Sequence, residues 1–287
     1  MKALLFPGQG SQKLGMGRVL AQNSPIAKAV FDEVDAALGE KLSAVIWGED
    51  ESALNATENA QPAILAMSVA SYRAAGSPPA DFVLGHSLGE YGALVASGAI
   101  GLFDGAKLLR ARGLAMKAAA SGKMMAVLGL AIDRVAEICG RYDSLWVAND
   151  NCPGQVVVSG SKEAIEKSAV EFASAGAKRA LPLDVSVPAH CPLMLPARVE
   201  MEKLLAKSDI KNPEIPFVSN RTARVAPGDE IKSLLAEQMT CGVRFRECVE
   251  FLAEQGVSEA FEVGEGAVLS GLVKRSTDRI IAGNLEA

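Results

Sequence analysis

The sequence predicts an α/β protein whose large domain has a mainly parallel sheet and carries a small inserted domain. Strand patterns alternate with amphipathic helical patterns before residue 122 and after residue 188, which is typical of a parallel sheet covered by helices. Between these limits the order is strand, helix, strand, strand, helix, strand, the βαββαβ order of a ferredoxin-like module. We therefore expect a large domain at residues 1–121 and 189–287 and a ferredoxin-like subdomain at 122–188.

The first half of the large domain alternates short apolar runs with helical spacing. Pro62 suits an early helical position, where its missing N–H costs nothing. Asp104 is a residue type that favours the N-cap. The expected elements are a strand at 3–6, helices at 24–40 and 63–75, a strand at 82–84, and helices at 88–100 and 104–120.

The inserted segment and the second half follow the same logic. In the insert we expect strands at 124–130, 145–148, 155–159 and 178–184, with helices at 133–142 and 161–175. A cluster of prolines between residues 182 and 196 marks the return to the large domain. Beyond it we expect helices at 197–206, 230–239, 245–254 and 268–275, and strands at 215–219 and 260–263.

Composition and charge exclude several classes of function. The chain has 29 basic and 34 acidic residues, a net charge of −5, and no basic cluster long enough to bind nucleic acid. Its five cysteines are scattered without a CxxC pair, so we expect neither disulfides nor a metal site. No apolar run approaches the roughly 20 residues of a membrane span, and the opening residues are too short for a secretory signal. We expect a cytoplasmic monomer that binds no membrane.

Residues 82–89 hold the most informative motif. Three large apolar residues end a predicted strand, and Gly85, Ser87 and Gly89 then form the pattern G-x-S-x-G. Glycines allow the strand to turn sharply into a helix, which exposes the serine hydroxyl on a strained corner. We expect Ser87 to be a nucleophile; the alternative is a tight turn that happens to carry a serine.

Arg112 is the most informative charge. Its neighbours one helical turn away are all apolar: Leu108, Leu109, Ala115 and Met116. A guanidinium cannot lose its charge, so inside an apolar stripe it needs an anionic partner, and no acid lies within one turn. We expect the partner to be a carboxylate supplied by a ligand. The alternative is that the side chain reaches the surface or forms a distant ion pair.

A serine nucleophile needs a base, and the chain has only two histidines. His86 adjoins Ser87, and consecutive side chains on such a turn diverge, so His86 is poorly placed to accept the serine proton. His190 lies far downstream in a proline-flanked loop, where a nucleophile-then-histidine order places the base. No acid between them is a persuasive third member. We expect a backbone carbonyl or an amide side chain to fix the imidazole tautomer.

A glycine-rich loop, Pro7-Gly8-Gln9-Gly10-Ser11-Gln12, follows the first strand. It fails as a dinucleotide fingerprint, because Lys13 stands where the third glycine belongs and Pro7 interrupts the strand-to-turn junction. We therefore expect no nucleotide cofactor here. The loop still allows backbone N–H groups to approach a ligand closely.

Five segments occur in the order and approximate spacing of one family: Phe6–Gln12, Gly85–Tyr91, Arg112-Gly113, Pro153–Val157 and Val187–Cys191. On these motifs the sequence resembles the malonyl-CoA:acyl carrier protein transacylases of fatty acid synthesis over nearly its whole length. The resemblance implies an α/β-hydrolase-like large domain with a ferredoxin-like insert. It also implies transfer of malonyl from malonyl-CoA to Ser87 and then to the phosphopantetheine thiol of holo acyl carrier protein, without a cofactor.

The resemblance also implies roles for single residues. The family's nucleophile, base and carboxylate-binding arginine fall on Ser87, His190 and Arg112. Its oxyanion hole uses backbone N–H groups at the positions of Gln9 and Leu88, which gives the glycine-rich loop a use. A main-chain carbonyl close to the position of Gln238 orients the histidine in the family, which explains the missing acid.

Docking of a carrier protein requires a surface of complementary charge. The carrier is expected to be acidic, and this chain is acidic too, so docking requires a local basic patch. The candidates are Lys178, Arg179, Lys274 and Arg275, with ordinary solvated charges as the alternative. The chain departs from the family at Glu265, where a proline is usual; this change bears on the entrance and not on the chemistry.

Three other functions stay open from the sequence. A discrete acyltransferase serving a polyketide synthase would share every catalytic residue. A serine esterase or thioesterase is disfavoured by Arg112 and by the missing triad acid. A non-catalytic carrier-binding protein is disfavoured by the intact pair of Ser87 and His190.

Overall fold

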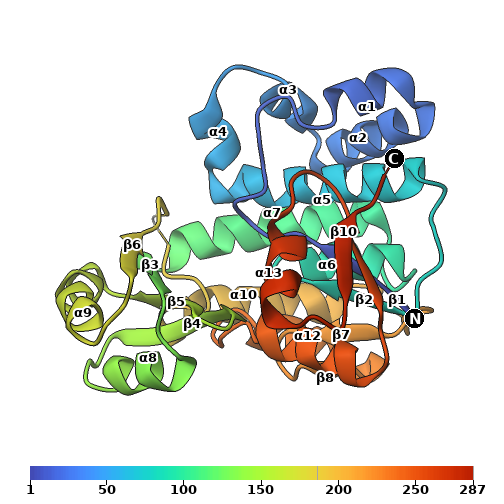
Figure 1. The fold of residues 1–287 in the computed structure, drawn as a ribbon. Helices are drawn as coiled ribbons and strands as arrows, with labels where there is room; N and C mark the ends of the chain where they lie inside the picture. The colour runs from blue at the N-terminus through green and yellow to red at the C-terminus, as the bar shows by residue number, and fades with distance from the viewer. Residues whose placement is uncertain (186, 287) are drawn as a thin grey trace.

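The computed structural model describes residues 1–185 and 187–286, and this part of the chain forms two β-sheets (Figure 1). The larger sheet has the order β10-β9-β1-β2-β7-β8 and is parallel except for β8. Its strands are β1 (Lys2–Phe6), β2 (Phe82–Gly85), β7 (Phe217–Ser219), β8 (Arg224–Val225), β9 (Glu259–Glu262) and β10 (Ile281–Asn284). Phe6 pairs with Gly85, so the loop after β1 and the turn after β2 begin at the same edge.

Helices cover both faces of the larger sheet. They are α1 (Arg18–Asn23), α2 (Pro25–Leu38), α3 (Leu42–Ile46), α4 (Glu51–Asn55), α5 (Thr57–Ala74), α6 (Gly89–Ala96), α7 (Leu102–Ala119), α10 (Leu195–Lys207), α11 (Ile231–Glu237), α12 (Phe245–Glu254) and α13 (Val268–Ser276). Along β1, Leu4 and Phe6 pack with α2, α5, α6 and α7, whereas Ala3 and Leu5 pack with α12 and α13. This alternation buries the central strand on both faces.

The smaller sheet is antiparallel, in the order β4-β5-β3-β6. Its elements are β3 (Lys123–Leu128), α8 (Ile132–Cys139), β4 (Leu145–Cys152), β5 (Gln155–Gly160), α9 (Lys162–Ser174) and β6 (Arg179–Pro182). Met125 and Val127 pack against α8 and α9, so both helices lie on one face. The intervening Met124 and Ala126 pack with the core of the larger part. The face without helices is therefore turned toward the larger sheet (Figure 1).

A short backbone contact ties the smaller sheet to the segment that precedes α12. The Val243 N–H donates to the carbonyl of Ala148 at 2.8 Å, and the Asp150 N–H donates to the carbonyl of Val243 at 2.9 Å. Beside these bonds, Arg246 of α12 forms an ion pair of 2.8 Å with Asp150, whose side chain is buried. Strand β4 is thus held at fixed register against the segment that leads into α12.

The predicted α/β fold with a mainly parallel sheet is confirmed, but two predicted helix starts are wrong. Helix α5 begins at Thr57, so Pro62 lies inside it and not near its start. Helix α7 is capped by Gly101, and Asp104 lies in its first turn, where a negative charge favours the helix dipole. The sequence does not predict β8 or the edge strand β10, because they have too few residues for a pattern of alternating apolar and polar side chains to be recognised. Among the described residues, no helix is long and apolar enough to span a membrane.

Candidate active site

Ser87 occupies a strained turn between β2 and α6. Its φ is +52°, in the left-handed region that non-glycine residues seldom adopt. The flanking glycines are required by space, because a Cβ on Gly85 would lie 2.0 Å from the backbone nitrogen of Glu90 and one on Gly89 would lie 2.1 Å from the Phe6 carbonyl. Asn220 holds the turn: its Oδ1 accepts from the Ser87 N–H at 2.8 Å, and its Nδ2 donates to Gly85 O at 2.7 Å.

His190 lies beside Ser87, although 103 residues separate them in the chain. The distance from Ser87 Oγ to His190 Nε2 is 2.8 Å, and that from His190 Nδ1 to the main-chain oxygen of Gln238 is also 2.8 Å. A carbonyl only accepts hydrogen bonds, so Nδ1 carries the proton and Nε2 is free to accept from the serine hydroxyl. His86 instead pairs through Nε2 with Asn151 Oδ1 at 2.8 Å.

The surroundings of His190 keep its imidazole neutral. Burial lowers its pKa to about 3, and the positive charge of Arg112 acts in the same direction. The hydrogen bond to the Gln238 carbonyl opposes this shift, because it favours the protonated ring. His190 is therefore neutral at neutral pH, with Nε2 free to accept a hydrogen bond. It is also a weaker base than an exposed imidazole, because no carboxylate stabilises the imidazolium.

Arg112 is held next to Ser87 in the interior of the protein. It is 1% exposed, and α7 brings it there by packing closely on α5: a Cβ on Gly113 would lie only 2.5 Å from Glu58 Cα. Its Nη1 donates to Gln61 Oε1 at 2.7 Å, and its Nη2 donates to Gln238 Oε1 at 3.0 Å and to Ser87 Oγ at 3.2 Å. Among the described residues no carboxylate pairs with Arg112, and its Nε has no partner. The guanidinium can therefore still bind an anion.

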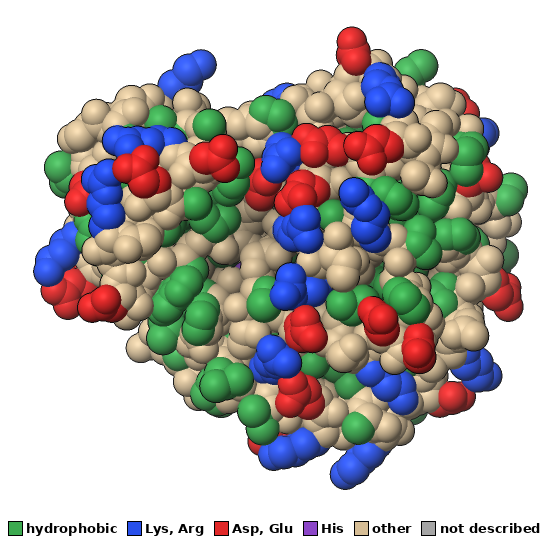
Figure 2. Space-filling model, turned by 90° about the horizontal axis from the view of Figure 1, so that it is seen from below, with side chains coloured by type: hydrophobic (Ala, Val, Ile, Leu, Met, Phe, Trp, Pro, Cys, Tyr) green, Lys and Arg blue, Asp and Glu red, His purple; other side chains and the backbone are tan. Residues whose placement is uncertain are grey.

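A cavity of about 460 Å³ joins these groups. Its walls come from the loop at residues 7–12, the helix-free face of β3 and β5, one side of α13, and the segment that holds residues 183–185, Val187, Ala189 and His190. Gln9 and Leu88 both line it, and within the described residues neither backbone N–H donates to another protein atom. Figure 2 shows the surface hollowed between the smaller lobe and the larger body. The cavity has the volume of a small-molecule site.

The four basic residues expected at a docking patch lie on the surface in two places. Lys178 and Arg179 are exposed at the start of β6, and Lys274 and Arg275 are exposed at the end of α13. Arg275 donates from Nη1 to Gln155 Oε1 at 2.6 Å, and Gln155 lines the cavity, which places this arginine at its rim. Acidic and basic side chains are interspersed on the face in Figure 2.

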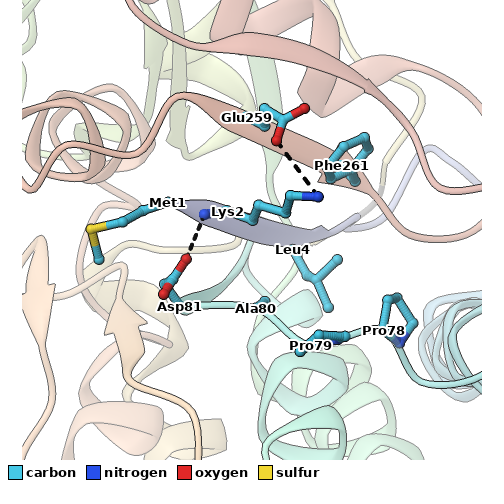
Figure 3. A pocket seen from close by; sticks show the side chains of 9 residues that line it. All are labelled: Met1, Lys2, Leu4, Pro78, Pro79, Ala80, Asp81, Glu259 and Phe261. Carbon is cyan, nitrogen blue, oxygen red and sulfur yellow. Dashed lines mark hydrogen bonds and ion pairs between the residues drawn. The ribbon is translucent and has the colours of Figure 1, made fainter.

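A second cavity, of about 500 Å³, lies elsewhere, at the amino ends of β1 and β9 (Figure 3). Its charged groups already pair with one another: Lys2 Nζ lies 3.6 Å from Glu259, and the Lys2 N–H donates to Asp81 at 2.7 Å. It contains no nucleophile and no buried polar side chain, so the chemistry belongs to the cavity at Ser87.

Comparison with known proteins agrees with this geometry. Residues 3–281 match the acyl transferase domain family. The chain belongs to that family. The malonyl CoA-acyl carrier protein transacylase of Bacillus subtilis (strain 168) is 42% identical over 289 residues, covering 97% of this chain and 91% of the relative. That of Escherichia coli (strain K12) is 42% identical over 294 residues, covering 99% and 95%.

Solved structures of the acyl transferase family superpose closely on the chain. The acyl-carrier-protein-S-malonyltransferase of Bartonella henselae has a TM-score of 0.96 at 42% identity, covering all of this chain and 95% of that one. A malonyl-transacylase in complex with a type II PKS acyl-carrier protein has a TM-score of 0.96 at 38% identity, covering all of this chain and 96% of that one.

Three site residues escape the sequence analysis: Gln61, Glu90 and Asn220. Gln61 directly precedes Pro62, and Glu90 directly follows Gly89 of the G-x-S-x-G motif. Nothing in the sequence around either residue indicates that its side chain is 0% exposed or that it is hydrogen-bonded to a residue far along the chain. Asn220 follows β7 with no surrounding motif, so nothing in the sequence indicates that it holds the turn at Ser87.

The state of His190 gives a prediction about pH. A base with an ordinary histidine pKa of about 6.5 would lose roughly 30-fold in its neutral fraction between pH 7.5 and 5. Because burial lowers the pKa of His190 to about 3, we expect the rate of Ser87 acylation to change less than about twofold over that range. Rapid-quench measurement of the acyl-enzyme at each pH tests this.

The same lowered pKa affects stability with a defined sign. The unfolded chain binds a proton at this histidine below about pH 6.5 and the folded one does not, so stability should decline as the pH falls from there toward 3. Circular dichroism at each pH therefore serves as the control for folding. An inflection in the acylation rate near pH 6.5, with the fold intact, would contradict the assignment of a buried neutral base.

Proposed function

We propose that this protein transfers the malonyl group from malonyl-CoA to the phosphopantetheine thiol of an acyl carrier protein, supplying fatty acid elongation. The observation that carries the proposal is the contact of 3.2 Å between Arg112 Nη2 and Ser87 Oγ. An acyl group attached to Ser87 that ends in a free carboxylate can place this carboxylate at the guanidinium, where a bidentate pair is strong.

The reaction proceeds in two halves at the same residues. In the first, His190 Nε2 accepts the hydroxyl proton as Ser87 Oγ attacks the thioester carbonyl, and the oxyanion lies near the N–H groups of Gln9 and Leu88. The carbon–sulfur bond then breaks, and the imidazolium returns the proton to the coenzyme A sulfur. In the second half, His190 accepts the proton of the carrier thiol as its sulfur attacks the carbonyl carbon of malonyl-serine. The ester carbon–oxygen bond then breaks, and the imidazolium returns the proton to Ser87 Oγ. The residues perform this chemistry without a cofactor.

A polyketide pathway is the second candidate, because one structural relative was solved with a type II PKS acyl-carrier protein. Both pathways use the same thiol and the same acyl group, so they differ only in the carrier that docks. A serine esterase or thioesterase is disfavoured for two reasons. Arg112 beside Ser87 favours an acyl group that carries a free carboxylate, and His190 lacks the acidic partner of a hydrolase triad.

We further propose that the large domain is α/β-hydrolase-like, formed by residues 1–121 and 189–287, and that residues 122–188 are an inserted ferredoxin-like subdomain. The pairing of β2 with β7 across this segment supports the insertion. The four antiparallel strands, with β3 and β5 central and two helices on one face, support the ferredoxin-like assignment. Ser87, Arg112 and His190 come from one chain, which supports an active monomer, and we infer a cytoplasmic location from the pathway.

The covalent intermediate provides the direct test. Intact-protein mass spectrometry after mixing with malonyl-CoA should show one added malonyl group, which disappears when holo carrier protein is added. Ser87→Ala should abolish the added mass, because the hydroxyl is the attachment point. Ser168→Ala is the matched control, since that buried hydroxyl only donates to the Ile165 carbonyl. Stable malonyl loading of Ser87→Ala would refute the assignment.

Arg112 should set the acyl preference. Acetyl-CoA leaves the buried guanidinium without an anion, a penalty of roughly 2–5 kcal/mol, or on the order of 30- to several-thousand-fold in rate. Arg112→Ala should remove the penalty, so that malonyl transfer falls steeply while acetyl transfer holds or improves. Arg112→Lys should restore little malonyl transfer, because an ammonium group cannot form the two parallel hydrogen bonds that a guanidinium makes with a carboxylate.

Parallel acylation of each variant with both thioesters measures this preference. Arg110→Ala on the same helix is the control, since Arg110 pairs with Glu40 and Asn59 outside the cavity. It should leave the ratio of malonyl to acetyl transfer unchanged. If Arg112→Ala lowers malonyl and acetyl transfer by the same factor, Arg112 does not determine the acyl preference.

The exposed basic residues should serve carrier docking. Reversing Lys178, Arg179, Lys274 and Arg275 to glutamate should raise the KM for holo carrier protein and leave the KM for malonyl-CoA unchanged, because an acidic carrier is attracted to the rim. Reversing Lys162 and Lys167, exposed on α9 outside the cavity lining, is the control. An equal change in both KM values would reject the patch.

A further inference from the structure

Glu90 is a fully buried carboxyl group immediately behind the nucleophile. It lies in the first turn of α6 with 0% exposure, and it does not line the cavity. Burial raises the pKa of Glu90, whereas the N–H donors around it and the positive charge of Arg112 oppose that shift. Burying a carboxyl group destabilises the folded protein unless both of its oxygens form hydrogen bonds.

One oxygen of Glu90 holds the segment that supports the turn at Ser87. Its Oε1 accepts from the backbone N–H of Asn220 at 2.6 Å. Asn220 in turn clamps the backbone on both sides of His86, through Ser87 N and Gly85 O. The carboxyl group thus fixes the residue that keeps Ser87 in its strained conformation.

The other oxygen of Glu90 holds the side chain of Gln238. Its Oε2 accepts from Gln238 Nε2, which also donates to the carbonyl of Ser87 at 3.1 Å. With the amide nitrogen committed to these acceptors, Gln238 Oε1 faces Arg112 Nη2 at 3.0 Å. The reverse orientation of the amide would direct its NH₂ group at the guanidinium, placing donor against donor.

We propose that Glu90 is a positioning residue that fixes the orientation of the Gln238 amide, and through it the guanidinium of Arg112 that selects the malonyl group. This inference rests on the proposed function. The group at position 90 faces two N–H donors, from Asn220 and Gln238, and the two oxygens of its carboxyl group accept one hydrogen bond each. A glutamine there must direct its own NH₂ group at one of them.

The test is the ratio of malonyl to acetyl loading in Glu90→Gln. We expect the ratio to fall by roughly 10- to 100-fold, the worth of a hydrogen bond to a charged group, because Gln238 turns and Arg112 loses its acceptor. Glu262→Gln is the matched control: Glu262 is equally buried and accepts the N–H groups of Val268 and Ser270. It should leave the ratio unchanged, whatever it costs in stability.

A double-mutant cycle separates this positioning role from a general structural one. Gln238→Ala keeps the main-chain carbonyl that anchors His190 but removes the amide, so it should lower the ratio by a similar factor. Glu90→Gln combined with Gln238→Ala should add little, because both act through one contact. Additive effects, or equal loss of malonyl and acetyl loading in Glu90→Gln, would overturn the proposal.

Glu90→Asp keeps the test decisive if Glu90→Gln does not fold. Aspartate retains two acceptor oxygens on a shorter side chain, so it should keep more malonyl preference than Gln238→Ala does. A ratio in Glu90→Asp as low as that of Gln238→Ala would contradict the proposal. A wild-type enzyme without malonyl preference would instead refute the proposed function, so the two failures are distinguishable.

Discussion

The buried guanidinium of Arg112 is the constraint on which the rest of the site depends. A permanent cation in the interior must be hydrogen-bonded, yet a protein carboxylate in direct contact would occupy the place needed for the substrate's carboxylate. The structure satisfies it instead with two neutral amide oxygens and a hydroxyl, from Gln61, Gln238 and Ser87. These partners stabilise the charge without cancelling it, so the guanidinium retains its attraction for an anion.

The same cation explains the form of the catalytic pair. It lies close enough to His190 to lower the pKa of the imidazole, on top of the effect of burial. The orienting group is the Gln238 carbonyl, a dipole that fixes the tautomer at 2.8 Å but carries no net charge. Gln238 therefore serves both partners of Ser87, because its main chain orients the base and its side chain contacts the arginine.

The sequence suffices for the residues whose chemistry is unusual in their local setting. A serine between glycines after an apolar strand, and an arginine among apolar helical neighbours, can each be recognised from a few positions. Gln61, Asn220 and Glu90 cannot, because they are common polar residues whose importance comes from burial and from partners up to 148 positions away. Helix boundaries fail for a related reason: tertiary packing of α5 against α7 outweighs the local preference of Pro62.

Recognition of the acyl group and recognition of the carrier are physically separate in this architecture. In the proposed reaction the acyl group lies in the buried cavity at Arg112, and the body of a carrier protein docks at the exposed rim, where Arg275 approaches Gln155. A fatty acid carrier and a polyketide carrier deliver the same thiol to Ser87 and His190. Under the proposed function, exchange of surface charges would therefore change the carrier without altering the malonyl preference.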